Sequence, residues 1–382
     1  MKMMFANGLF DNYSRHAIVK LLGAALVALT AVAAQAAAQE EKVLNIYNWS
    51  DYIADDTIKN FEKETGIKIR YDNFDSNEIL HAKLLAGNTG YDIVVPSAHW
   101  AHLQIEAGLL RKLDKSKLSN LGNLDPAIQS ELAKLDPNND HLVDWLWGYT
   151  TVGINVGKVK AALGNLPMPD NAWDLVFDPK YISKLKSCGV SFLDSPSEIL
   201  PPALRYLGKN PSSNVPADYQ EAGRLLQKIR PNVTLFSSAS YINDMANGAI
   251  CLAVGWSGDI NIARHRAIEA KNGNQIEALV PKTGATLFFD TMAIPSDAPH
   301  PQNALLFMNY ILRPEVHASL TNKVFYANPN VPSLKYVIKE VRDNKSVFLS
   351  AADMKKMVAP QPLSNDIRRL ATRIYTQFKS GL

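Results

Sequence analysis

Cysteine is scarce in this sequence, with only Cys188 and Cys251 among 382 residues. Neither lies near the N-terminus, so no thiol there could carry a lipid anchor.

A strong excess of charge is also lacking, because 40 Lys and Arg face 37 Asp and Glu, for a formal net charge of +3. Such a small, evenly spread charge excludes nucleic acid as a partner. Any attraction for a cation must therefore come from a local acidic site.

Long apolar runs are limited to one segment near the start, residues 21–34, which follows the basic residues Lys2, Arg15 and Lys20. The run is short for a membrane span, and small residues in A-x-A spacing follow it, which is typical of a secretory signal peptide. We expect residues 1–38 to be a signal peptide cleaved near residues 36–39, with a membrane anchor as the alternative.

Export would place Cys188 and Cys251 in an oxidising compartment, where we expect a disulfide. Two inert buried thiols are the alternative.

Short apolar runs alternate with helical patterns, which predicts an α/β fold. The first three runs, in βαβαβα order, predict a parallel sheet covered by helices on both faces. The expected strands are 43–47, 67–71, 92–95, 152–155, 189–193, 233–236, 250–254, 276–280 and 287–294. After the leader there is no internal repeat, no low-complexity tract and no long flexible linker. Two lobes joined by short crossings fit this pattern better than two separate domains on a tether.

Aromatic residues stand next to carboxylates where several expected strands end, which is where open α/β sheets bind ligands. Three such clusters follow strands: Asn48–Tyr52, Leu193–Glu198 and Gly255–Asp259. A fourth, Phe288–Asp290, lies inside a late strand, and Tyr326 adds a further aromatic residue. Taken singly, each cluster has a structural explanation: the tryptophans as core residues, the aspartates as helix N-caps or salt-bridge partners. Their recurrence at comparable positions favours a shared site.

An alkyl diammonium would suit such a set of residues. Its amines have pKa values near ~10.4 and are charged at neutral pH. Each buried ammonium needs a carboxylate partner, and aromatic rings both wall in the methylenes and attract the cations. An amino acid ligand would instead need an Arg for its carboxylate, and these clusters contain none.

Sequence motifs of common enzymes are absent. Neither H-E-x-x-H nor G-x-S-x-G occurs, and His99 and His102 have helical spacing without a third metal ligand nearby. Carboxylates beside tryptophans also describe a glycosidase cleft, but each carboxylate has a better use in holding a cation. We therefore expect no enzyme activity, no metal and no cofactor.

At these residues the chain resembles the periplasmic spermidine/putrescine-binding proteins of bacterial polyamine importers. The resemblance extends from about Val43 to the end. It is strongest in Tyr47–Ile53, Gly90–Ser97, Cys188–Asp194, Gly255–Asp259 and Tyr326–Asn328.

The resemblance implies the periplasmic binding protein fold, in which two α/β lobes of discontinuous segments surround a hinged ligand cleft. The first lobe would comprise residues 40–147 and 268–323, and the second 148–267 and 324–382. The protein would be a periplasmic monomer that delivers its ligand to the permease of an inner-membrane ABC importer. Cys188 and Cys251 match the disulfide pair of the family.

The resemblance also implies a role for each matching residue. Trp49, Trp256, Phe288 and Tyr326 would box the aliphatic chain, and Asp259 and Asp290 would pair with the ammonium ends. Ser50, Asp51 and Tyr52 would line the first-lobe wall, Ser97 and Ser238 would add polar contacts, and Glu198 would act at one end of the pocket.

The preferred ligand implied by the resemblance is putrescine. Ser50-Asp51 after Trp49, together with Trp256, is similar to the putrescine-preferring members, whereas spermidine would need a further acidic partner. One departure from the family pattern is Ala98-His99-Trp100 after Ser97, which would reshape the pocket rim. The alternatives are the same fold binding another small cation, or a sensor subunit that reports polyamine to a membrane receptor.

Overall fold

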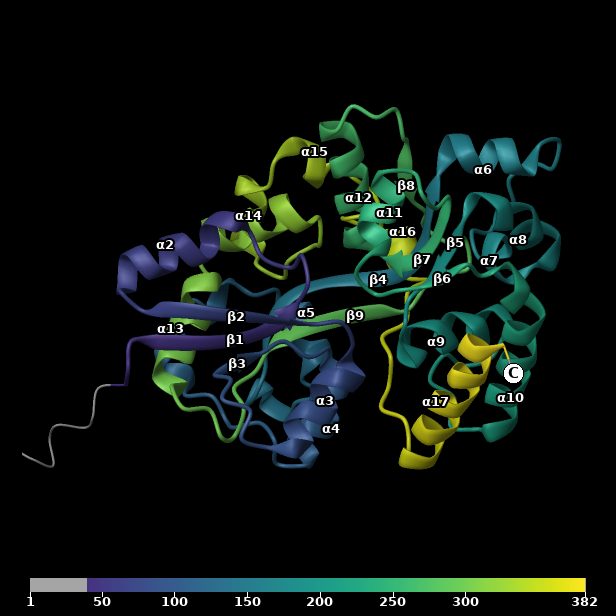
Figure 1. The fold of residues 1–382 in the computed structure, drawn as a ribbon. Helices are drawn as coiled ribbons and strands as arrows, with labels where there is room; N and C mark the ends of the chain where they lie inside the picture. The colour runs from purple at the N-terminus through teal and green to yellow at the C-terminus, as the bar shows by residue number, and fades with distance from the viewer. Residues whose placement is uncertain (1–39, 382) are drawn as a thin grey trace, which may run out of the picture. The chain divides into compact units, whose positions relative to one another are not determined.

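The computed structural model describes residues 40–381, so the expected signal peptide at residues 1–38 lies outside the described residues. Two β-sheets organise this part of the chain, one built from its first hundred residues and the other from its middle (Figure 1). No helix between residues 40 and 381 is long and apolar enough to cross a bilayer.

The first sheet has three parallel strands in the order β2-β1-β3. They are β1 (Val43–Trp49), β2 (Lys68–Phe74) and β3 (Ile93–Val94). The helices that follow them are α2 (Asp55–Thr65), α3 (Asn77–Ala86) and α4 (Ala98–Glu106). Gly66 ends α2 in the left-handed conformation, with φ 72°, where a side chain would be strained.

The second sheet has the order β6-β5-β7-β4-β8. Its strands β5 (Val190–Phe192), β6 (Leu235–Phe236) and β7 (Leu252–Trp256) are parallel, and each is followed by a helix. These helices are α9 (Pro196–Tyr206), α11 (Tyr241–Ala246) and α12 (Ser257–Glu269). β8 (Ile276–Ala278) pairs antiparallel with β4 at Gly153–Asn155.

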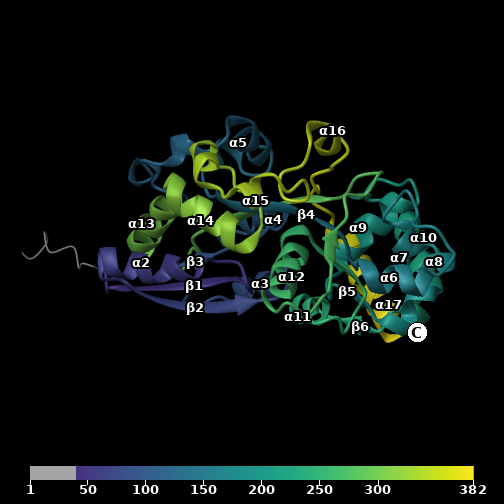
Figure 2. The same ribbon diagram turned by 90° about the horizontal axis from the view of Figure 1, so that it is seen from above.

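One long strand, β4 (Val143–Asn155), belongs to both parts of the fold, and all 13 of its residues are buried. Its first half pairs with β9 (Leu287–Met292) and its second half with β7 and β8. β9 extends toward the first sheet, because isolated bridges join Val94 to Ala293 and Ser97 to Asp290. In both views β4 runs between the two groups of strands (Figures 1 and 2).

The remaining helices cover these sheets. They are α5 (Pro126–Leu132), α6 (Val156–Leu163), α7 (Asp174–Phe177), α8 (Pro179–Leu185), α10 (Pro216–Ile229), α13 (Pro301–Ile311), α14 (Pro314–Val324), α15 (Lys339–Arg342), α16 (Ala351–Met354) and α17 (Asn365–Ser380). The chain ends in α17, which packs against α9 and α10 beside the second sheet (Figure 2).

The expected α/β fold is confirmed, and each expected strand overlaps a strand of the structure. The parallel sheet expected from the first three strands is confirmed. The second sheet is mixed, since β4 is antiparallel to β7, β8 and β9. β4 also begins nine residues before the expected 152. Buried polar residues such as Asp144, Thr150 and Thr151 interrupt its apolar pattern, so the sequence alone does not read as a central strand.

The expected disulfide between Cys188 and Cys251 is present, with the two Cα atoms 5.4 Å apart. It ties the turn before β5 to the start of β7. These two strands are neighbours in the second sheet, so the bridge strengthens a contact that the backbone hydrogen bonds already make.

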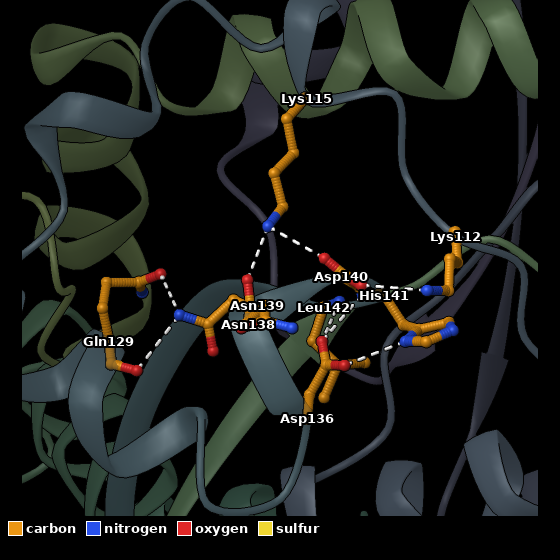
Figure 3. Close-up of polar contacts among 9 residues, drawn as sticks. All are labelled: Lys112, Lys115, Gln129, Asp136, Asn138, Asn139, Asp140, His141 and Leu142. Carbon is orange, nitrogen blue, oxygen red and sulfur yellow. Dashed lines mark hydrogen bonds and ion pairs between the residues drawn. The ribbon is translucent and has the colours of Figure 1, made fainter.

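The entry to β4 is held by a polar network around buried Asp136 (Figure 3). Its carboxylate accepts the backbone N–H groups of His141 at 2.7 Å and Leu142 at 2.9 Å, and contacts Nδ1 of His141 at 2.9 Å. Lys112 and Lys115 hold the carboxylate of the adjacent Asp140. A carboxylate that satisfies two backbone donors fixes the turn from which β4 starts.

We predict that Asp136→Ala destabilises the protein by about 2–4 kcal/mol, because it leaves two buried backbone donors without a partner. The measurement is urea unfolding with the disulfide intact. Asp366→Ala is the control, since the side chain of Asp366 is 94% exposed. Equal unfolding midpoints for the two variants would contradict the role of this network.

Candidate functional site

A cavity lies where β1, β2, β7 and β9 approach one another. It combines aromatic rings with carboxylates. Its lining is Trp49, Ser50, Tyr52, Phe74, Asp75, Ser97, Glu198, Ser238, Ile242, Trp256, Asp259, Phe288, Asp290 and Tyr326. Every expected site residue except Asp51 is therefore brought together here.

Asp290 is held by two hydroxyl groups from the first sheet's side of the cavity. Ser97 Oγ donates to one carboxylate oxygen at 2.6 Å, and Tyr52 Oη donates to the other at 2.9 Å. The residue is only 4% exposed. Burial raises the pKa of Asp290 to about 7, although these two hydrogen bonds oppose the rise.

Asp259 has the same kind of support from the opposite side. Tyr326 Oη donates to it at 2.6 Å and Tyr241 Oη at 2.9 Å. Asp259 lies in the first turn of α12, directly after β7, and its backbone N–H donates to Tyr326 Oη at 3.2 Å. Burial raises the pKa of Asp259 to about 7, and the two tyrosine hydroxyls lower it.

Glu198 is the third buried carboxylate of the cavity. It lies in the first turn of α9 and accepts a hydrogen bond from Thr150 Oγ1 at 2.5 Å. Burial raises the pKa of Glu198 to about 7. The main contacts of all three carboxylates are thus neutral hydroxyl donors, which orient the negative charges without neutralising them.

Aromatic rings form the walls. Trp49 and Trp256 meet edge to face, with ring centroids 5.4 Å apart, and the indole N–H of Trp49 donates to the carbonyl of Val95 at 2.9 Å. Tyr326 packs against Tyr52 at 4.9 Å and against Phe288 at 6.1 Å. These contacts fix the orientation of the ring faces.

Gly258 makes this packing possible. A Cβ atom built there would stand 2.2 Å from the ring of Tyr326, well inside van der Waals contact. The glycine after Ser257 therefore lets Tyr326 reach the start of α12 and the carboxylate of Asp259.

Asp51, expected on the cavity wall, lies elsewhere. Its backbone has φ 53°, and its carboxylate pairs with Arg266 on α12 at 2.7 Å. The left-handed turn directs the side chain toward Arg266, about two turns into α12. Because Asp51 follows β1 and Arg266 belongs to α12, this ion pair joins the two halves of the fold beside the cavity.

Several residues near the site were missed from the sequence, among them Tyr241 and Thr150, which donate to Asp259 and Glu198. Phe74, Asp75 and Ile242 line the cavity, and Asn77 supports it by exchanging two hydrogen bonds with Ser97, at 2.9 and 3.0 Å. Phe74 and Asp75 stand at the end of β2, so the same search for residues beyond strand ends could have found them. Asn77 and Ile242 carry no such signal.

The cavity selects for positive charge. Four carboxylates line it, and none of the described residues lining it is Lys, Arg or His. An anion would meet only repulsion there, and a wholly apolar ligand would leave buried charges unpaired. An organic cation with an apolar middle matches both the acidic groups and the aromatic walls.

Comparison with known proteins shows the family. The profile of the bacterial extracellular solute-binding proteins matches residues 56–345. The chain is 49% identical to the putrescine-binding periplasmic protein PotF of Escherichia coli (strain K12) over 362 residues, 94% of this chain and 98% of that protein. It is 48% identical to the putrescine-binding periplasmic protein SpuD of Pseudomonas aeruginosa (strain UCBPP-PA14) over 367 residues, 95% and 100% of the two chains.

A solved structure agrees. The spermidine/putrescine ABC transporter substrate-binding protein PotD from Streptococcus pneumoniae superimposes with a TM-score of 0.70 at 27% identity, covering 89% of this chain and 99% of that one. The chain therefore belongs to the bacterial extracellular solute-binding proteins, with a two-lobed α/β fold, and it is a transport protein rather than an enzyme.

We predict that a cation bound between these carboxylates releases protons near neutral pH. A neighbouring positive charge favours the ionised form and lowers each raised pKa, so binding near pH 7 displaces the protons that Asp259, Asp290 and Glu198 carry. Affinity should then fall below pH 7, by up to about tenfold per pH unit for each linked carboxylate.

Titration calorimetry of the binding reaction in buffers of different ionisation enthalpy, at pH 7, would count the protons. Repeating it at pH 5.5 and 8.5 gives the pH dependence of the dissociation constant. Binding that releases no proton and keeps the same affinity across this range would contradict the linkage.

Proposed function

We propose that this chain captures a polyamine in the periplasm, with putrescine preferred over spermidine, and delivers it to an ABC-type importer of the inner membrane. The observation that carries the proposal is a cavity lined by four carboxylates and by aromatic rings, with no basic side chain among the described residues that line it. Putrescine has the matching form, two ammonium ends joined by four methylenes.

The charge arrangement suggests how a diamine would lie. Asp259 and Asp290 belong to different elements, α12 and β9, and each is presented by hydroxyls from its own surroundings. One ammonium would pair with each aspartate, and Glu198 would assist at one end. Trp49, Trp256, Phe288 and Tyr326 would enclose the methylenes, and Ser97 and Ser238 would contribute polar contacts.

The relatives support this ligand. PotF and SpuD, both about half identical to this chain, are named for putrescine, and a Pseudomonas aeruginosa relative at 39% identity is named a putrescine/agmatine-binding protein. The relatives named for both spermidine and putrescine are more distant, at 33% identity. The sensor alternative has no counterpart in these names.

The expected lobe boundaries and cleavage site stay part of the proposal. The first lobe would comprise residues 40–147 and 268–323. Because β8 pairs with β4 in the second sheet, the second crossing between the lobes would lie nearer Leu287 than residue 268. Cleavage of the leader near residues 36–39 would release the mature protein into the periplasm, where we expect it to be a monomer.

Titration calorimetry with putrescine, cadaverine, spermidine and arginine tests the proposal. We expect putrescine to bind with micromolar or tighter affinity, about −8 kcal/mol or better, and spermidine to bind at least about tenfold more weakly, because a third ammonium lacks a carboxylate partner. Tight spermidine binding with weak putrescine binding would overturn the preference. No binding to any polyamine would overturn the proposed function.

Asp259→Asn and Asp290→Asn should each weaken putrescine binding by about 2–5 kcal/mol, because each leaves one buried ammonium without its counter-charge. The control is Asp170→Asn, whose side chain is 86% exposed. Circular dichroism checks that the fold is retained. A variant that binds with wild-type affinity would remove that aspartate from the site.

A further inference from the structure

Glu78, in the first turn of α3, contacts a helix from the other half of the fold. Its two carboxylate oxygens accept the hydroxyl of Ser195 at 3.2 and 3.3 Å, and one of them accepts the backbone N–H of Ser197 at 3.4 Å. α3 follows β2 of the first sheet, whereas Ser195 and Ser197 stand at the start of α9, after β5 of the second sheet. This contact therefore joins the two halves.

The start of α9 lacks a cap of its own. Ser195 occupies the N-cap position, but its side chain makes no capping hydrogen bond within the helix. The first N–H groups of any helix need partners from outside the helical ladder, and that end of the helix favours negative charge. Glu78 supplies both the acceptor and the charge from across the cleft.

The same turn of α9 carries Glu198, whose carboxylate lines the cavity. Holding the start of α9 therefore also holds Glu198. The residue before Glu78 has a parallel effect on the other side, since Asn77 bonds Ser97 and Ser97 bonds Asp290. The first turn of α3 therefore contacts both the start of α9, which carries Glu198, and Ser97, which holds Asp290.

We propose that Glu78 is a positioning residue that latches α3 onto the start of α9 once the lobes have closed, and so slows ligand release and keeps Glu198 directed into the cavity. The inference rests on the proposed function for its ligand. It is independent of the ion pair between Asp51 and Arg266, because the two contacts join different elements.

Because the latch forms whenever the lobes close and must break before a ligand can leave, it should act on the dissociation rate. Stopped-flow measurement with putrescine should show that Glu78→Gln raises the dissociation rate about tenfold and leaves the association rate within about twofold. Glu277→Gln, an exposed glutamate on β8, is the matched control and should change neither rate. A merely destabilised variant would instead lower the active fraction at unchanged rates.

A double-mutant cycle identifies the partner. Ser195→Ala should also raise the dissociation rate, and adding it to Glu78→Gln should have little further effect, since both remove the same contact. Independent, multiplying effects of the two substitutions would overturn the latch, as would a wild-type dissociation rate in Glu78→Gln.

Hydrogen exchange at the amide of Ser197 tests the contact without requiring a polyamine. In the wild type this amide should exchange more slowly than in Glu78→Gln, with Glu277→Gln like the wild type. If the wild type binds no polyamine, the proposed function falls. The latch then stands if Ser197 keeps this difference in exchange, and it falls too if the difference is absent.

Discussion

The burial of negative charge without a protein cation is the constraint on which this site depends. Removing a carboxylate from water costs several kcal/mol unless a partner compensates for the loss. Here the compensation is partial, because hydroxyls of tyrosine, serine and threonine orient Asp259, Asp290 and Glu198 but leave their charge in place. Burial keeps the pKa of Tyr52, Tyr241 and Tyr326 well above the usual value, so these donors stay neutral. A bound cation would offset the remaining free-energy cost of removing these carboxylates from water.

Such a site requires a framework that does not relax around the charges. Each carboxylate is anchored near the end of a regular element, on β9, α12 or α9, and its donors come from other elements. Tyr326 illustrates the arrangement, since it donates to Asp259, accepts from the same residue's backbone and packs on Tyr52 and Phe288. Removing one member therefore disturbs several contacts.

Strand ends and their aromatic neighbours could be identified from the sequence, because apolar runs followed by Trp-Ser or Asp-Ser are visible locally. Trp49, Trp256 and Glu198 were found in this way, and Asp290 from the aromatic residues beside it in its own strand. Residues whose role depends on contacts between distant segments could not be found. Asn77 and Glu78 have a role only because α3 packs near Ser97 and the start of α9. Asp51 was misplaced because its backbone adopts φ 53° at a residue that is not glycine, and because Arg266 reaches it from a distant segment. The antiparallel direction of β4 likewise has no local signal.

The sharing of β4 between two groups of strands has a further consequence for how the sequence can vary. Side chains alternate along a strand, so a slip of one residue would turn each of them to the opposite face. In β4 the slip would misplace residues against β9 and, at the same time, against β7 and β8. An insertion or deletion anywhere in these 13 buried residues would therefore disturb the pairing with β9 as well as the pairing with β7 and β8. Length differences between related proteins should accordingly gather in the surface loops, and this strand should keep a constant length while its individual residues change.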